Sequence, residues 1–302
     1  MPGNRDIRRR IRSIRNTAQI TRAMQMVAAA KMRRAQQSAL SRRPYAKLMN
    51  RVIAEVSTHT GDLTHPFLEP GSSDKRCVII ISTDKGLCGA LNANLFREVT
   101  KFDTQNTLFI TAGKKASQFI ARTKRQLIAE FYYKDSPQFS EARAISRFAQ
   151  NLFLEGKVVR IDILFNNFVS TIVQKPLVVE FLPVKKIEGV STDVAGTELG
   201  IELQKSTYEF LFEPSAEKVL GAMLPHYLNF KVYQILLEAK ASEHSARMIA
   251  MKNATDNAAE LIKELTIKYN KVRQAAITKE ILEISTAQMA MENPWSMAQL
   301  GI

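Results

Sequence analysis

The stretch ASEHSARMIAMKNATDNA, residues 241–258, lies in a run that contains neither glycine nor proline from His226 to Ile284. Such a run predicts a helix of about 60 residues, about 90 Å long at roughly 1.5 Å per residue. That length exceeds an ordinary globular helix and indicates a coiled coil or a shaft. One face of this helix would form a seam against a partner helix. The seam begins with small residues and continues with larger ones: Ala239, Ser242, Ala246, Ala250, Ala254 and Ala258, then Ile262, Leu265, Tyr269 and Val272.

We expect residues 4–57 to form the helix that pairs with it, because they hold one proline, Pro44, and no glycine. At roughly 100° per residue, one seam of apolar or small residues runs along them. The alanine-rich part, AAAKMRRAQQSA (28–39), would let a neighbouring backbone approach closely. We therefore expect an antiparallel pair of terminal helices. The seam consists of Ile7, Ile11, Ile14, Ala18, Thr21, Ala28 and Met32.

The second helix is the longer of the two, so its C-terminal end should project beyond the first. That end still carries apolar residues, which would be exposed on a lone coil and would need a socket in another molecule. They are Ile277, Ile281, Leu282 and Ile284.

Positive charge is concentrated at the N-terminus. The chain has a net charge of +14, and nearly all of it comes from residues 1–51, where Asp6 is the lone acid. Pairs within the helix therefore cannot neutralise the arginines. An acidic counterpart is expected: nucleic acid, an anionic membrane or an acidic protein. The arginine stripe is Arg8, Arg12, Arg15, Arg22 and Arg33, and a second apolar patch beside the seam is Ile20, Met24 and Val27.

The middle of the chain predicts a different architecture. Turn-forming residues at 58–75 indicate a linker. Four short apolar runs then alternate with helical stretches, one of them at 138–155, which favours a Rossmann-like α/β domain around a mostly parallel sheet. The runs are RCVIIIS (76–82), TLFITAG (107–113), RIDILFNNF (160–168) and KPLVVEFLP (175–183). Residues 184–207 look like a surface loop. The predicted parts are 1–57 (coiled-coil helix), 58–75 (linker), 76–207 (α/β domain), 208–288 (coiled-coil helix) and 289–302 (tail).

Little in the sequence indicates chemistry. The loop TDKGLCGALN (83–92) resembles a phosphate loop, but it lacks the GxxxxGK[ST] motif, and tight turns explain its glycines. The histidines lack metal-ligand spacing, and Cys77 and Cys88 have neither metal-ligand nor CxxC spacing, which favours reduced thiols. We therefore expect no cofactor and no metal. Glu243 and Arg247 form a helical i, i+4 pair. No run of 18 apolar residues is present, so no bilayer insertion is expected.

Three blocks together resemble the gamma subunit of F-type, proton-translocating ATP synthases: RIRSIRNTAQITRAMQMVAAAKMRRAQ (10–36), STDKGLCGALNANL (82–95), and ASEHSARMIAMKNATDNA (241–258) leading into YNKVRQAAITKEILEI (269–284). The resemblance covers nearly the whole chain. It implies a non-catalytic rotor shaft whose terminal helices turn inside a ring of alpha and beta subunits. Its α/β domain would touch the epsilon subunit and the ring of c subunits. The shaft would transmit torque during ATP synthesis or hydrolysis, at the cytoplasmic face of a bacterial plasma membrane.

The resemblance also assigns contact residues. Met24 matches a position that faces the acidic loop of a beta subunit. The other rotor–stator contacts that it implies are Arg8, Arg9, Arg12, Arg247, Arg273, Gln274, Thr278 and Glu280. The ending STAQMAMENPWSMAQLGI (285–302) departs from the short ending usual in the family. Two alternatives stay open on the residues alone. One is a basic coiled-coil protein that binds nucleic acid, although residues 1–51 hold one aromatic residue, Tyr45. The other is a nucleotide-using enzyme.

Overall fold

The computed structural model describes residues 4–42, 44–45, 48–49, 52, 65–184, 213 and 215–292. The chain divides into two compact units. The first combines Met1–Met24 with Met251–Ile302, and the second is Gln25–Ala250. Two long helices, α1 (Asn4–Ser41) and α6 (Ala216–Glu292), each contribute to both units.

A five-stranded sheet forms the centre of the second unit, in the order β3-β2-β1-β4-β5. The first four of these strands run parallel, and β5 is antiparallel to β4. The predicted α/β domain with a mostly parallel sheet is therefore confirmed. The strands are β1 (Arg76–Ile81), β2 (Thr107–Ala112), β3 (Gln126–Phe131), β4 (Arg160–Phe168) and β5 (Gln174–Leu182).

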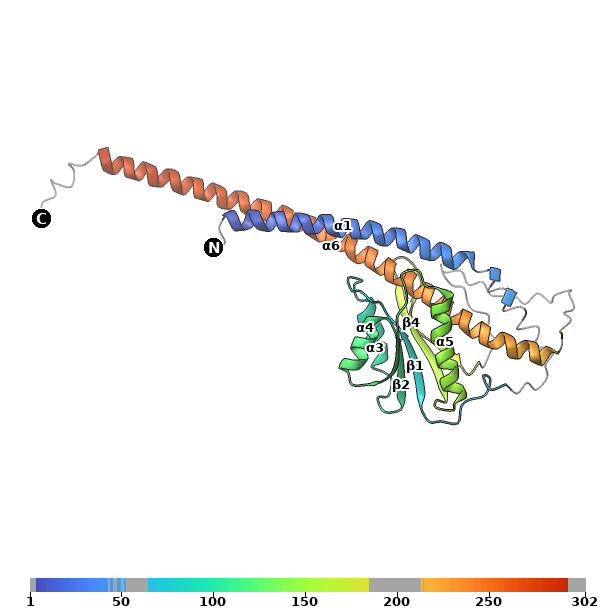
Figure 1. Ribbon diagram of the computed structural model, residues 1–302. Helices are drawn as coiled ribbons and strands as arrows, with labels where there is room; N and C mark the ends of the chain where they lie inside the picture. Colours follow the sequence, from blue (N-terminus) through green and yellow to red (C-terminus); the bar gives the residue numbers. More distant parts are fainter. Residues whose placement is uncertain are drawn as a thin grey trace. The chain divides into compact units, whose positions relative to one another are not determined.

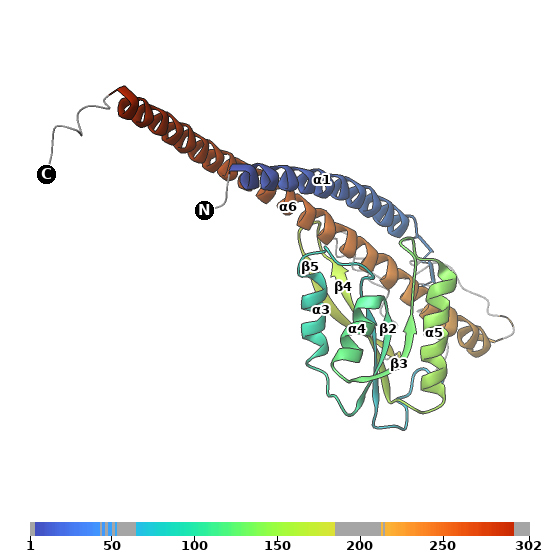
Figure 2. The same cartoon turned by 60° about the vertical axis from the view of Figure 1, so that its left-hand side comes forward.

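Helices cover both faces of this sheet, as Figures 1 and 2 show. On one face, α3 (Leu91–Val99) and α4 (Lys114–Arg122) pack on alternate residues of the central strands, such as Val78 and Ile80 of β1. On the other face, α5 (Phe139–Leu154) and the first part of α6 pack on the intervening residues, such as Ile79. Every residue from Cys77 to Ile81 is at most 1% exposed, which explains why β1 reads as a continuous apolar run.

One strand was missed from the sequence. β3 lies at an edge of the sheet and pairs only with β2 in the described chain. Its residues Leu127 and Ile128 are each 37% exposed. The strand therefore has neither the apolar–polar alternation of a half-buried strand nor the continuous apolar run of a buried one. The strands that were predicted agree with the structure to within one residue at each end.

The first helix is shorter than predicted. We expected it to extend to residue 57. α1 ends at Ser41, and residues 53–57 of the expected helix lie outside the described residues. Pro44 explains the break, because proline disfavours helical geometry in the residue before it and lacks the amide donor. The Arg42 side chain donates a hydrogen bond of 2.8 Å to the Ser38 carbonyl, which satisfies one of the free acceptors at the helix end. Residues 44–45, 48–49 and 52 are again helical.

The last helix is longer than its proline-free run. It begins at Ala216 and contains Pro225. It also continues to Glu292, past the predicted boundary at 288, while the rest of the tail lies outside the described residues. Residues 58–64 of the expected linker and 185–207 of the expected domain also lie outside them.

In the first unit, α1 and α6 lie side by side, as both views show. Ile7 and Ala258 are buried, and the Thr21 and Thr255 hydroxyls are 2.8 Å apart. Both predicted seams are thus confirmed here. The end of α6 extends past the start of α1, and from Arg273 to Met289 every residue except Ser285 is exposed.

Candidate interaction surfaces

The arginines of the first unit point to solvent. Arg8, Arg12 and Arg15 are exposed on α1, and no ion pair is found for them among the described residues. Arg9 differs, because its guanidinium lies 3.2 Å from the Asp6 carboxylate, although 83% of its side chain remains exposed. Surface pairs of this kind contribute little. The stripe is therefore an uncompensated positive surface in the isolated chain.

The second apolar patch is also open to solvent. Ile20 is 61% exposed and Val27 55% exposed. Met24, the residue that the resemblance places against a beta subunit, is partly buried. Ile20 and Met24 belong to the first unit, and Val27 lies just inside the second. Most of this face of α1 is therefore unpartnered within its own unit.

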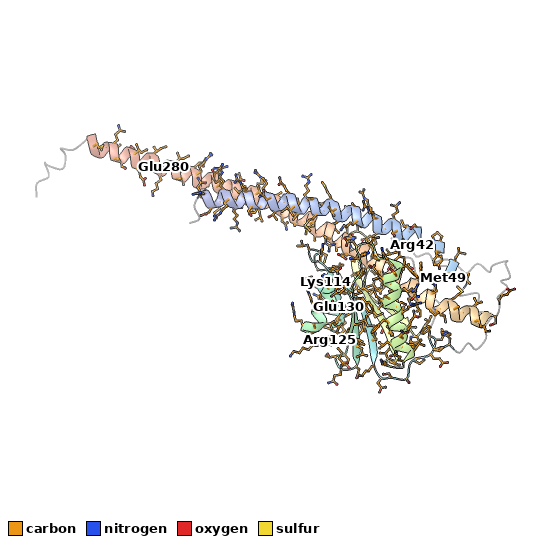
Figure 3. The ribbon with its side chains drawn as sticks, viewed as in Figure 1. Arg42, Met49, Lys114, Arg125, Glu130 and Glu280 are labelled. Carbon is orange, nitrogen blue, oxygen red and sulfur yellow. The ribbon has the colours of Figure 1, made fainter. Side chains whose placement is uncertain are left out.

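The projecting end of α6 carries both polar and apolar candidates. Arg273, Gln274 and Glu280 are exposed, and Figure 3 shows Glu280 on this stretch. The Thr278 hydroxyl donates to the Gln274 carbonyl at 2.9 Å, so it is tied to its own helix. The four predicted apolar residues are exposed: Ile277 47%, Ile281 60%, Leu282 59% and Ile284 68%. Met289, which was not predicted, is 66% exposed.

Arg247 is placed differently from the other candidates. It lies in the second unit, and its side chain is 12% exposed. Its guanidinium is 2.8 Å from the Glu243 carboxylate, which confirms the predicted i, i+4 pair. It also donates to the carbonyls of Lys85 and Gly86 at 3.4 Å. Sequence reasoning missed the other partner of Glu243, a buried lysine at position 240.

The phosphate-like loop after β1 and the residue before it contact the start of α4, the helix that follows β2. The amide donors at the start of α4 are occupied: Lys114 donates to the Asp84 carboxylate at 3.0 Å, and Ala116 donates to the Ser82 hydroxyl at 2.8 Å. At the adjoining loop, Cys88 and Leu91 pack against Ala246 of α6. α6 thus packs on the loop that follows the carboxyl end of β1, in the region where α/β domains usually bind ligands.

Other predicted features also have clear positions. Cys77 and Cys88 are free and buried, and burial raises the pKa of the Cys88 thiol. His244 is buried, and His226 is exposed and 2.7 Å from the Tyr45 hydroxyl. Among the described residues, no group of three His, Cys, Asp or Glu side chains could hold a metal ion. No helix in the described part of the chain has the length and apolar character needed to cross a membrane.

Comparison with known proteins extends these observations. A family model described as ATP synthase matches residues 3–291. The ATP synthase gamma chain of Methylacidiphilum infernorum is 46% identical over 296 residues, which cover 96% of this chain and 100% of the relative. That of Opitutus terrae is 46% identical over 294 residues, which cover 96% and 99%. These relatives give no support to the nucleic-acid alternative.

Solved structures support the same fold. The rotor of the Euglena gracilis mitochondrial ATP synthase matches with a TM-score of 0.65 at 19% identity, over 91% of this chain and 98% of that one. A second structure of that synthase, containing OSCP, F1 and the c ring, matches with a TM-score of 0.67 at 20% identity, over 99% and 97%. The fold shared with these chains consists of two long terminal helices with an α/β domain inserted between them. The chain belongs to the ATP synthase gamma chain family, whose members are non-catalytic subunits of that complex.

Proposed function

We propose that this protein is the rotor shaft that carries torque between a proton-driven ring of c subunits and the catalytic beta subunits. The observation that carries the proposal is the projecting end of α6. Its exposed apolar residues, Ile281, Leu282 and Ile284 among them, extend beyond the start of α1. Exposed apolar surface of this kind favours a protein socket, and a sleeve of alpha and beta subunits would supply one.

The arginine stripe supports a second part of the proposal. Arg8, Arg9 and Arg12 would face acidic loops of the beta subunits, together with the exposed polar residues of α6. Uncompensated positive charge attracts an acidic surface and fixes its orientation. On this proposal the rotor–stator contacts are Arg8, Arg9, Arg12, Met24, Arg247, Arg273, Gln274, Thr278 and Glu280.

The finer assembly follows from the same proposal. The α/β domain would bind the epsilon subunit and the c ring, and the complex would lie at the cytoplasmic face of a bacterial plasma membrane. The bacterial origin of the relatives supports this location. Neither nucleic acid nor direct insertion into the bilayer is part of the proposal.

A rotation measurement tests the function. The full chain is co-expressed with alpha and beta subunits, the complex is fixed to a surface through beta, and a bead is attached to the α/β domain. Both native cysteines are buried, so a cysteine introduced at exposed Leu154 gives one attachment point. We expect stepwise rotation driven by ATP. A chain that does not co-purify with alpha and beta, or a bead that stays still while ATP is hydrolysed, would contradict the proposal.

A further inference from the structure

α6 carries a lysine in the interior of the second unit. Lys240 is 2% exposed. Its ammonium nitrogen lies 2.9 Å from the Glu243 carboxylate, 3.7 Å from the Asp135 carboxylate and 4.6 Å from the centre of the Tyr133 ring. A buried ammonium group needs such partners, because leaving water is costly for a charge.

The interactions continue on both sides of this lysine. Asp135 lies between β3 and α5 and also accepts a hydrogen bond from Lys31 of α1. Glu243 holds Arg247, which reaches the carbonyls of the loop after β1. Charges alternate in sign along the series, which we call the ionic chain: Lys31, Asp135, Lys240, Glu243 and Arg247. It joins α1, α6 and two loops of the α/β domain.

Near the ionic chain, α1 contributes small side chains to its apolar contacts. Ala35 and Ala39 of α1 pack in a cluster with Ala241 of α6 and Phe168 of β4. Alanine surfaces are smooth, so neighbouring rotations of one helix would bury similar areas. Buried ion pairs add little net stability over apolar groups of the same size, but their geometry can select one arrangement.

We propose that Lys240 and Asp135 are positioning residues that lock α1 in one rotation against α6 and the α/β domain. Torque applied to the domain would then turn both helices together. This inference rests on the proposed function as a rotor shaft. It concerns residues 25–250 alone, within which all members of the ionic chain lie.

The test measures torsional stiffness in the complex of alpha, beta and the full chain. The readout is the angular variance of a bead on the α/β domain while the rotor is paused by bound nucleotide. Lys240→Met removes the central cation, and Lys31→Met breaks only the link to α1. Lys31→Arg keeps that charge. Lys231→Met is the matched control, because the Lys231 ammonium donates to the Glu180 carbonyl at 2.8 Å and is not part of the ionic chain.

We expect Lys240→Met to raise the angular variance roughly twofold, because breaking the buried Lys240–Glu243 pair leaves the Glu243 carboxylate uncompensated. Lys31→Met should raise it by less, because the Lys31–Asp135 pair is partly exposed. Lys31→Arg and Lys231→Met should keep the variance of the unsubstituted chain. If the Lys240→Met chain does not assemble with alpha and beta, the comparison of Lys31→Met with Lys31→Arg tests the inference. Both variants should assemble, because the Lys31 side chain is 42% exposed. Unchanged variance in Lys31→Met, or an equal rise in Lys231→Met, overturns the inference. A bead that does not rotate with the unsubstituted chain would instead contradict the proposed function.

Discussion

His244 is 2% exposed, and its Nδ1 atom has no hydrogen-bond partner among the described residues. Burial disfavours the imidazolium form and lowers the pKa of this histidine to about 4, against the smaller opposing effect of Glu243. The unfolded chain takes up the proton near pH 6.5, whereas the folded chain does so only near pH 4. His244 therefore contributes full stability above pH 6.5, and this contribution falls as the pH falls towards 4.

Substitution of this histidine should flatten the acid side of the stability profile. When the pH is lowered from 7 to 5, His244 should reduce the unfolding free energy of the unsubstituted chain by about 2 kcal/mol. His244→Gln removes the titrating group, so its loss over that interval should be smaller by about this amount. Urea unfolding at the two pH values measures the difference. His226→Gln, at an exposed position, is the control, and equal slopes in the two variants would contradict the prediction.

A second residue-scale prediction concerns Gly113, between β2 and α4. Its φ is +108°, and an added Cβ would lie 2.3 Å from the Ser82 carbonyl oxygen. Gly113→Ala should therefore lower the unfolding free energy by about 2–4 kcal/mol, through backbone strain and overlap. Gly86→Ala is the matched control, because its Cβ would meet no atom within 4 Å. Thermal unfolding compares the two, and equal melting temperatures would show that the backbone relaxes freely at Gly113.

At the scale of elements, periodicity was most informative where one face is buried. Ile7, Thr21 and Ala28 are buried as the seam of α1 predicted, and β1, β2, β4 and β5 fall where their apolar runs predicted. The edge strand β3 and the early end of α1 were not predicted. Both depend on neighbours: β3 is a strand because β2 offers it an edge, and one proline outweighed a pattern that otherwise favoured helix.

The candidate surfaces were predictable to different degrees. Exposed apolar residues at the end of α6 follow from helix lengths alone. The association of Lys31 with Asp135 does not, because 104 positions separate them and only the tertiary fold brings them together. Arg247 was matched through the family resemblance, but its contacts with the loop after β1 required the structure. The roles of Arg273, Gln274 and Glu280 stay predictions.

The helix pair of the first unit gives an element-scale prediction. Ala258 is 6% exposed, whereas its neighbour Ala259 is exposed. Ala258→Leu should force the helices apart and cost about 1–3 kcal/mol of unfolding free energy. Ala259→Leu should change it by less than about 0.5 kcal/mol. Chemical denaturation of the full chain measures both. A similar effect of the two substitutions would mean that the seam does not set the distance between the helices.

For the molecule as a whole, the distribution of charge matters more than its amount. Residues 1–51 hold nearly all of the net charge of +14, and the arginines of α1 have few acids near them. Such a surface destabilises the isolated chain slightly through repulsion and favours binding to an acidic partner. Stability and function should therefore respond in opposite directions when these charges are reversed.

The triple substitution Arg8→Glu, Arg12→Glu and Arg15→Glu tests this opposition. The melting temperature of the isolated chain should stay equal or rise, because repulsion along α1 is relieved. In the assembled complex, ATP-driven proton pumping per complex should fall by roughly an order of magnitude, because like charges would face each other at the rotor–stator contact. The control is Arg122→Glu with Lys124→Glu, two exposed positions of the α/β domain. If the triple variant pumped like the control, the arginine stripe would be a solvated surface without a partner, and the apolar end of α6 would carry the rotor–stator contact alone.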